Sequence, residues 1–252
     1  MSVEALAAPD RIVRIRNEIM SRLEQIRDKI KYAEHQRQNL MNTLFDSKKE
    51  KIDPEFLVHT ASDILSSSRE CYDYCAQDIL SLLIIPNTGN QRLIERYNNN
   101  LIHAYFPFYE NQLTNNQNPF YELRIISPEF YNYLVKLSQD IAANKEIPNT
   151  LFMYGDILLL KDMVNEKKHN KLIALEKNEN QELLIENPGM KMIIPLKDQK
   201  GWNRIKVSHE SNLSRVVEFR FEAIDKEIAK FCLFATGSTK IILEDIYSKY
   251  LQ

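Results

Sequence analysis

Hydrophobic residues recur at alternating three- and four-residue steps from residue 10 to about residue 46, and charged residues fill most of the positions between them. This period predicts one long amphipathic helix. Its apolar positions are Ile12, Ile15, Ile19, Leu23, Ile26, Ile30, Ala33, Leu40 and Leu44, with Arg37 interrupting the row. Two interpretations stay open: the helix packs into the protein's own core, or it is a coiled-coil-like arm that binds a second copy or a protein partner.

Capping signals mark the start of two further helices. Asp53-Pro54-Glu55 predicts a helix that runs to about Leu83 and ends at 86–89, and Ser127-Pro128-Glu129 predicts one that runs to about Ala143. In each case a side chain suited to the N-cap precedes a proline and an acid in the first turn.

The segments around these helices are assigned by periodicity and composition. Helices are expected over 91–105, where Pro107 ends the pattern, and over 152–175. The Asn- and Gln-rich stretch 110–119 is expected to be a loop.

The period changes after residue 175. Short β-like patterns cover 190–195, 204–208 and 216–221, while 222–235 fits helix or strand, and a terminal helix is expected from Ser238. The sequence therefore predicts an α+β fold, in which a helical bundle precedes a small antiparallel sheet with a C-terminal helix. The expected division is a helical domain over 1–175 and a strand-rich segment with a terminal helix over 176–252.

Composition excludes several classes of protein. The chain of 252 residues has five glycines, a formal charge of −2 and no Gly-rich phosphate loop, so neither a nucleotide loop nor a general nucleic-acid binder is indicated. No apolar run approaches the ~18 residues that span a bilayer, so no membrane contact is expected. Three cysteines (Cys71, Cys75 and Cys232) favour buried free thiols in a reducing, cytoplasmic setting. No metal-binding spacing occurs, and neither a metal nor a cofactor is expected.

Three stretches resemble, in the same order, a family of uncharacterised bacterial proteins. Residues 63–76 (DILSSSRECYDYCA) resemble its GDILHNLRSALDHLA helix, 105–108 (YFPF) its FPI element, and 165–172 (NEKKHNKL) its NxDKHRxL stretch. Arg69, Asp73, Lys168 and His169 match that pattern, whereas Tyr74 replaces a frequent histidine, and Lys167 and Asn170 also differ.

The helix of that family also resembles the HEPN superfamily of helical proteins. Many HEPN proteins are metal-independent ribonucleases that act as dimers in toxin or anti-phage defence systems, through an Arg-x(4–6)-His motif. Tyr74 breaks that motif after Arg69, but Arg96 and His103 have Arg-x(6)-His spacing, and Tyr105 follows two residues later. The resemblance therefore implies a HEPN-like bundle in which Arg96 and His103 are the catalytic pair.

Arg96 and His103 suit RNA cleavage by 2′-hydroxyl attack. A histidine can transfer a proton near neutral pH, and a guanidinium can offset the charge that develops on the phosphate. In the helix expected over 91–105 they share one face, two turns apart, with Asn99 and Asn100 between them. The alternative is a polar helix face with a histidine near its C-terminal end.

Two other polar groups are candidate substrate contacts. Arg69 and Asp73, four residues apart on one flank of their helix, are expected to form a structural ion pair between helices, or Arg69 reaches a shared polar pocket. Lys168 and His169 lie in the densest basic cluster, which could hold a phosphate or an RNA backbone, or be a solvated helix end. One hypothesis joins the sites, with Arg69, His103 and His169 converging in one groove.

Two functions lead as hypotheses, and a phosphate- or nucleotide-binding sensor with a pocket around Lys168 and His169 is a third possibility. The first is a HEPN-like, metal-independent ribonuclease of toxin or defence type, with RNA as its partner. The second is a non-catalytic helical binding or scaffold protein that forms a homodimer or holds a protein partner through the helix over 10–46. The ribonuclease needs Arg96 and His103 in one accessible polar hollow, and the scaffold needs uncovered apolar surface on the long helix.

Overall fold

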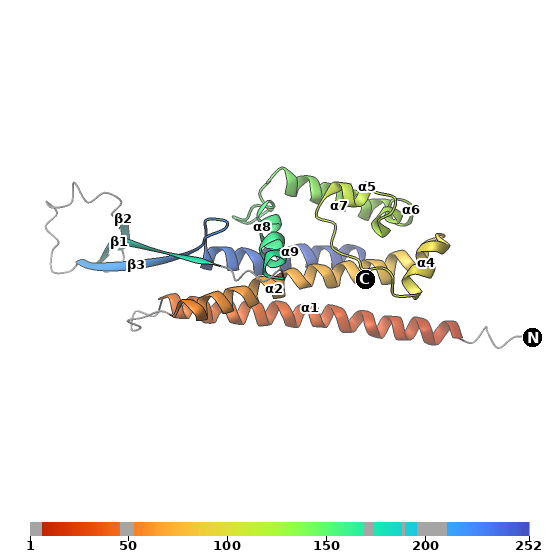
Figure 1. The fold of residues 1–252 in the computed structure, drawn as a ribbon, viewed down its shortest axis with the longest axis horizontal. Coiled ribbons are helices and arrows are strands. Elements are labelled where there is room, and N and C mark those ends of the chain that lie inside the picture. The colour runs from red at the N-terminus through yellow and green to blue at the C-terminus, as the bar shows by residue number, and fades with distance from the viewer. Residues whose placement is uncertain (1–6, 46–52, 169–173, 188–189, 196–210, 252) are drawn as a thin grey trace, which may run out of the picture. The chain divides into compact units, whose positions relative to one another are not determined.

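The computed structural model describes residues 7–45, 53–168, 174–187, 190–195 and 211–251. The described chain is mostly helical, with a small antiparallel sheet and a C-terminal helix, as the sequence predicts (Figure 1). It divides into two compact units, one formed by Met1–Leu172 with Phe231–Gln252 and the other by Ile173–Lys230. The helical unit therefore includes the terminal helix from Phe231 onward, and the second unit contains the strands.

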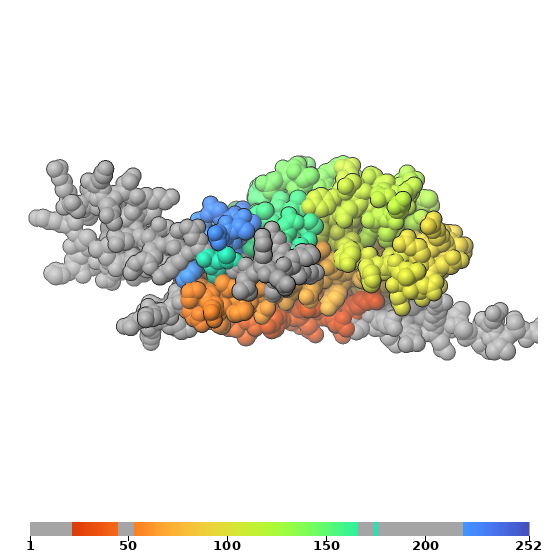
Figure 2. All heavy atoms as spheres, in the orientation of Figure 1, coloured from red at the N-terminus to blue at the C-terminus, as the bar shows by residue number. Residues whose placement is uncertain are grey.

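The helical unit has two long helices, several short ones and most of the terminal helix. Figure 2 shows α1 and α2 along one edge of this unit and α5 to α7 along the other. Its elements are α1 (Ala7–Phe45), α2 (Pro54–Asp78), the π-helix η2 (Ile79–Ile84), α3 (Ile85–Asn87), α4 (Gln91–Asn98), α5 (Glu110–Thr114), the 3₁₀-helix η3 (Pro119–Glu122), α6 (Leu123–Ile126), α7 (Pro128–Ala142), α8 (Asp156–Lys168) and α9 (Ile228–Tyr250).

Ion pairs between the long helices show their relative direction. Arg22 pairs with Asp78 at 2.8 Å and Lys29 with Glu70 at 2.6 Å, so α1 and α2 are antiparallel. Lys240 of α9 lies 3.5 Å from Glu34 of α1. The core between these helices is apolar and includes Ile26, Leu57, Ile64, Leu65, Ile79, Ile242 and Ile246, all buried.

The helix starts predicted at Asp53-Pro54 and Ser127-Pro128 are confirmed for α2 and α7, although the Ser127 side chain makes no capping hydrogen bond. The Asp53 carboxylate accepts a 2.9 Å hydrogen bond from the backbone N–H of Glu55, and Pro54 is the first residue of α2. Pro128 is likewise the first residue of α7, which ends at Ala142.

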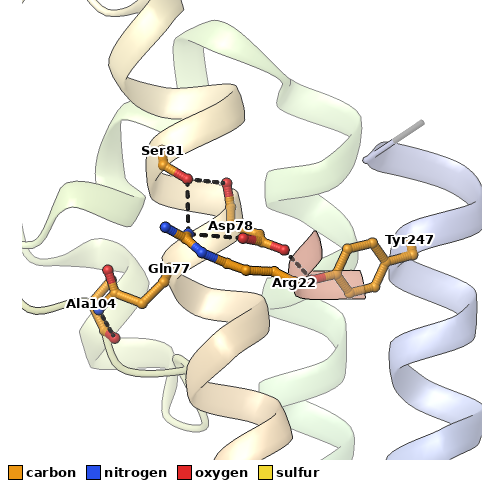
Figure 3. Close-up of polar contacts among 6 residues, drawn as sticks. All are labelled: Arg22, Gln77, Asp78, Ser81, Ala104 and Tyr247. Carbon is orange, nitrogen blue, oxygen red and sulfur yellow. Dashed lines mark hydrogen bonds and ion pairs between the residues drawn. The ribbon is translucent and has the colours of Figure 1, made fainter. Parts of the chain in front are cut away.

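An aromatic cluster anchors the segment after α4. The ring of Tyr72 meets those of Phe106 and Phe108 edge-on, with centroids 5.1 and 5.2 Å apart. Both phenylalanines are buried, and the Gln77 amide donates a 3.0 Å hydrogen bond to the carbonyl of Ala104 (Figure 3). Residues 101–108 are thereby held against α2 without regular structure.

The strand unit is an antiparallel sheet in the order β2-β1-β3-β4. Its strands are β1 (Leu175–Asn187), β2 (Met190–Pro195), β3 (Ser211–Phe221) and β4 (Lys226–Glu227). The strand predicted over 216–221 is confirmed within β3, where Phe219 and Phe221 are buried. The strand expected over 204–208 lies outside the described residues.

Several predicted boundaries are wrong. The helix expected over 152–175 ends at Lys168, and Leu175 begins β1, a strand that pairs with β3 from Leu175↔Phe221 to Ile185↔Ser211. The undecided stretch 222–235 divides into a turn, β4 and the start of α9. The terminal helix therefore starts at Ile228, ten residues before Ser238, because the Glu227 carboxylate accepts hydrogen bonds from the N–H groups of Ala229 and Lys230.

The stretch expected to be a loop over 110–119 contains α5. The backbone N–H of Tyr109 donates a 3.0 Å hydrogen bond to the Gln112 side chain, which supports the first turn. Asn118 then accepts a hydrogen bond from the N–H of Phe120 and starts η3. The Asn and Gln residues here act as local caps, which is why composition alone misassigned the segment.

Across the described ranges, no helix is both long and apolar enough to cross a membrane.

Candidate functional site

The helix expected over 91–105 stops at Asn98, so Arg96 and His103 do not share a helix face. Asn99 is the C-cap, and Asn100 has a positive φ of 55°. The N–H of Leu101 bonds to the carbonyl of Arg96 at 2.9 Å, and that of Asn100 to the carbonyl of Tyr97 at 3.0 Å. This pair of bonds is the Schellman ending of a helix, in which asparagine is one of the few residues that accept the left-handed position.

The turn nevertheless returns His103 to the same surface as Arg96. Both side chains are exposed, and both line a polar hollow of about 250 Å³. The rest of its lining comes from Leu93, Leu101, Ile102, Asn115, Gln117, Asn118 and Pro119. An imidazole and a guanidinium therefore face one surface depression, although the register that the motif implied is absent.

A second hollow of about 460 Å³ shares Arg96 with the first. Arg92 adds another cation to its lining, and Glu122 adds a carboxylate. Glu122 accepts hydrogen bonds from the Thr88 hydroxyl at 2.7 Å and the Asn90 amide at 3.1 Å. These bonds fix η3 against the start of α4, so the wall of the hollow is built by local contacts.

The other predicted site residues lie elsewhere. Asn99 donates to the carbonyl of Glu95 at 2.9 Å, and neither Asn99 nor Asn100 lines the polar hollow. Arg69 is buried, pairs with Asp73 at 2.6 Å and lies over the Phe108 ring at 5.0 Å. Arg69 and Asp73 thus pair with each other within α2, and not between helices as expected, and the pair packs on the aromatic cluster. Arg69 does not line the hollow with His103.

The other predicted phosphate contacts are Lys168 and His169. Lys168 is the last residue of α8, and its side chain, like all of His169, lies outside the described residues. Within the described ranges, no three His, Cys, Asp or Glu side chains are grouped so that they could hold a metal ion. Cys71, Cys75 and Cys232 are buried thiols that form no disulfide, as predicted.

A larger depression, here named the α1–α9 groove, lies between two antiparallel helices. Its volume is about 910 Å³. Its walls extend from Leu23 to Glu34 on α1 and from Lys240 to Leu251 at the end of the chain, each about 17 Å at the helical rise. The full lining is Leu23, Ile26, Arg27, Ile30, Lys31, Glu34, Leu82, Leu83, Lys240, Leu243, Glu244, Tyr247, Ser248, Tyr250 and Leu251.

The middle of the groove is apolar and its edges are charged. Leu82 and Leu83 come from the π-helix η2, where the widened turn departs from the α-helical face pattern of α2. Leu243 and Tyr247 contribute from α9, and both are themselves packed into the core. The groove is therefore formed by side chains whose positions the core fixes.

A buried polar network holds the walls together (Figure 3). Asp78 Oδ1 accepts a 2.8 Å bond from Arg22 Nη1, which also lies 3.2 Å from Ser81 Oγ, and Asp78 Oδ2 accepts a 2.6 Å bond from Tyr247 Oη. Burial raises the pKa of the Asp78 carboxyl, while the bonds from Tyr247 and Arg22 oppose that rise. Tyr247 thus lines the groove and is fixed by a carboxylate of α2 that also binds α1.

Sequence reasoning missed this network and the α9 wall of the groove. One signal was present, since Asp78 stands between Cys75 and Ile79 on the apolar face of its helix. A carboxylate in such a position needs a buried partner. The identity of that partner, 169 residues away in the chain, has no local signature.

In comparisons with known proteins, no protein family, curated protein or solved structure matches this chain.

Proposed function

We propose that this protein binds an amphipathic helix of a protein partner in the α1–α9 groove. The observation that supports this proposal is an apolar groove whose two walls are antiparallel helices of about three turns each. A helix laid along the groove contacts both walls on the side of the Lys240–Glu34 ion pair where the groove is not bridged, as in other complexes where an amphipathic helix enters a hydrophobic groove. Burial of apolar side chains over Leu23, Leu82 and Leu83, which are partly exposed, supplies the main favourable free energy.

The walls are rigid enough to act as a preformed site. Arg22, Asp78 and Tyr247 connect α1, α2 and α9 through two charge-assisted hydrogen bonds. The partner therefore does not have to order the groove when it binds, which preserves affinity.

The test uses a synthetic leucine-striped helical peptide of about 18 residues with glutamine flanks. Its binding is followed by fluorescence anisotropy with the full chain. Ser248→Trp places a large ring in the groove from an exposed position, so we expect affinity to fall at least about tenfold. Asn132→Trp makes an equal change on the exposed surface of α7 and should leave affinity unchanged. Failure of the wild-type chain to bind the peptide, or equal binding by both variants, would contradict the proposal.

A second candidate function is the HEPN-like, metal-independent cleavage of RNA, of the kind found in toxin and defence systems. The observation that favours it is that Arg96 and His103 line one hollow, beside the amides of Asn115 and Gln117. In this proposal His103 moves the proton of the attacking hydroxyl and Arg96 offsets the phosphate charge. Lys168 and His169 stay predicted phosphate contacts.

RNA cleavage in EDTA tests this second candidate. Wild type should produce cyclic-phosphate ends, His103→Ala should lose the activity, and His59→Ala, an exposed histidine of α2 outside the hollow, should keep it. Equal cleavage by His103→Ala and wild type would assign the activity to another site or to a contaminant. Absence of cleavage by the wild type would end the ribonuclease hypothesis.

A further inference from the structure

The charges along the α1–α9 groove are not symmetric. The α1 wall has Arg27 and Lys31 one turn apart, both exposed. Lys31 lies 3.7 Å from Asp28 of the same helix, in a pair exposed enough to contribute little. Among the described residues, Arg27 has no ion-pair partner. The α1 edge therefore presents two cations to anything that enters the groove.

The α9 wall carries the opposite charge at its exposed position. Glu244 lines the groove and, within the described part of the chain, has no ion-pair partner. Lys240, one turn before it, is already paired with Glu34 across the groove at 3.5 Å. This bridge neutralises one end of the groove and leaves a basic edge on α1 and an acidic edge on α9.

We propose, on the basis of the helix-binding function above, that the partner helix carries acidic residues on the flank that meets α1 and basic residues on the flank that meets α9. Arg27 and Lys31 then pair with the acidic flank, and Glu244 with the basic one. Turning the partner helix end for end exchanges its flanks, so these charges also select one of its two directions in the groove.

The charge pattern disfavours a second copy of α1 as the occupant. The apolar residues Ile12 and Ile15 at the start of α1 are accompanied in sequence by Arg11, Arg14 and Arg16. A helix segment with such a basic flank would face Arg27 and Lys31 of the other copy. Like charges at this spacing oppose binding, so the geometry favours a different protein chain.

Three peptides with one leucine stripe test the inference by fluorescence anisotropy at low salt. The first carries Glu on one flank and Lys on the other, the second carries Gln on both flanks, and the third carries Lys on both. We expect the Glu/Lys peptide to bind the wild-type protein about tenfold more tightly than the Lys/Lys peptide, which corresponds to about 1.4 kcal/mol. The Gln/Gln peptide should be intermediate, and the difference should shrink as salt is added.

The double variant Arg27→Glu/Lys31→Glu is the matched control, since both side chains are exposed and the fold does not depend on them. In this variant the preference should reverse, so that the Lys/Lys peptide binds more tightly than the Glu/Lys peptide. Equal binding of all three peptides by the wild type would overturn the inference and leave the helix-binding function intact. Binding of none would overturn both. Sedimentation that shows a wild-type dimer, dissociated by the double variant, would assign the groove to a second copy and overturn the inference.

Discussion

Tyr247 Oη donates a 2.6 Å hydrogen bond to Asp78 Oδ2 and so joins the last helix of the chain to the end of α2. Both residues are buried, and Tyr247 also lines the α1–α9 groove. The same carboxylate accepts the bond from Arg22 of α1. One buried acid therefore fixes the two helices that form the walls of the proposed binding site.

Removing the hydroxyl of Tyr247 should destabilise the protein without leaving a large cavity in the core. Tyr247→Phe deletes a hydrogen bond to a charged group, so we expect the free energy of unfolding to fall by about 1.5–3 kcal/mol. Urea unfolding followed by circular dichroism measures the change. Tyr250→Phe is the control. Tyr250 stacks on Phe130 through its ring, so the variant protein should lose little stability. Equal losses in the two variants would show that the bond to Asp78 contributes nothing specific.

The pH dependence of stability should carry the signature of Asp78. Burial raises the pKa of Asp78 above the ordinary 3.8, against the opposing effects of Tyr247 and Arg22. Between 3.8 and the raised pKa, the folded protein therefore keeps a proton that the unfolded chain has lost. The contribution of Asp78 to stability therefore falls as the pH rises from 3.8 through the raised pKa, and is constant above it. We expect the stability difference between wild type and Asp78→Asn to decrease over that interval.

Asp140 provides a comparison of opposite sign. Burial opposes ionisation, but Lys136 and Lys145 outweigh it and lower the pKa of this carboxyl. Its stabilising contribution is complete above the ordinary 3.8 and is lost as the pH falls through the lowered pKa. The difference in the free energy of unfolding between wild type and Asp140→Asn should therefore rise with pH below 3.8. If this difference had the same pH dependence for Asp78→Asn and Asp140→Asn, the assignment would be contradicted.

The thiols should be inert in the folded protein. Burial raises the pKa of Cys71 to about 12 and places that of Cys75 well above its usual range, so the reactive thiolate is scarce at pH 8. Iodoacetamide at pH 8, followed by mass spectrometry, should modify neither residue in native buffer and both in urea. Rapid native labelling would mean that α2 opens readily.

The ending of α4 depends on a residue that tolerates positive φ. Asn100→Gly should leave stability unchanged or raise it, whereas Asn100→Ala should lower it by about 1 kcal/mol, because the left-handed conformation places Cβ against the carbonyl oxygen. Thermal unfolding of both variants measures the difference. An Asn100→Ala variant as stable as Asn100→Gly would favour a continuous helix from Arg96 to His103.

Local signals predicted the long helices well. The apolar period predicted α1, and the sequences Asp53-Pro54 and Ser127-Pro128 predicted the starts of α2 and α7, because these signals involve residues close in sequence. β1 was missed because its first half, from Glu176 to Gln181, is polar throughout and has no alternation. That strand is defined by pairing with β3 along its length, which no local pattern reports.

The candidate sites were less predictable than the fold. Arg96 and His103 were identified from a spacing that assumed an unbroken helix, and the run Asn98-Asn99-Asn100 was the available sign that the helix ends. The hollow that they share depends on residues 115–119, which no motif connects to them. The α1–α9 groove likewise depends on how α9 packs against α1, a tertiary contact between the two ends of the chain.

Hydrogen exchange with and without the leucine-striped Glu/Lys peptide is the most direct test of the proposed binding site. Amide exchange should slow in two segments, 23–34 of α1 and 240–251 of α9, and stay unchanged over 91–119 around Arg96 and His103. Protection confined to 91–119, or no protection in either wall of the groove, would contradict the proposal that this protein binds a partner helix there.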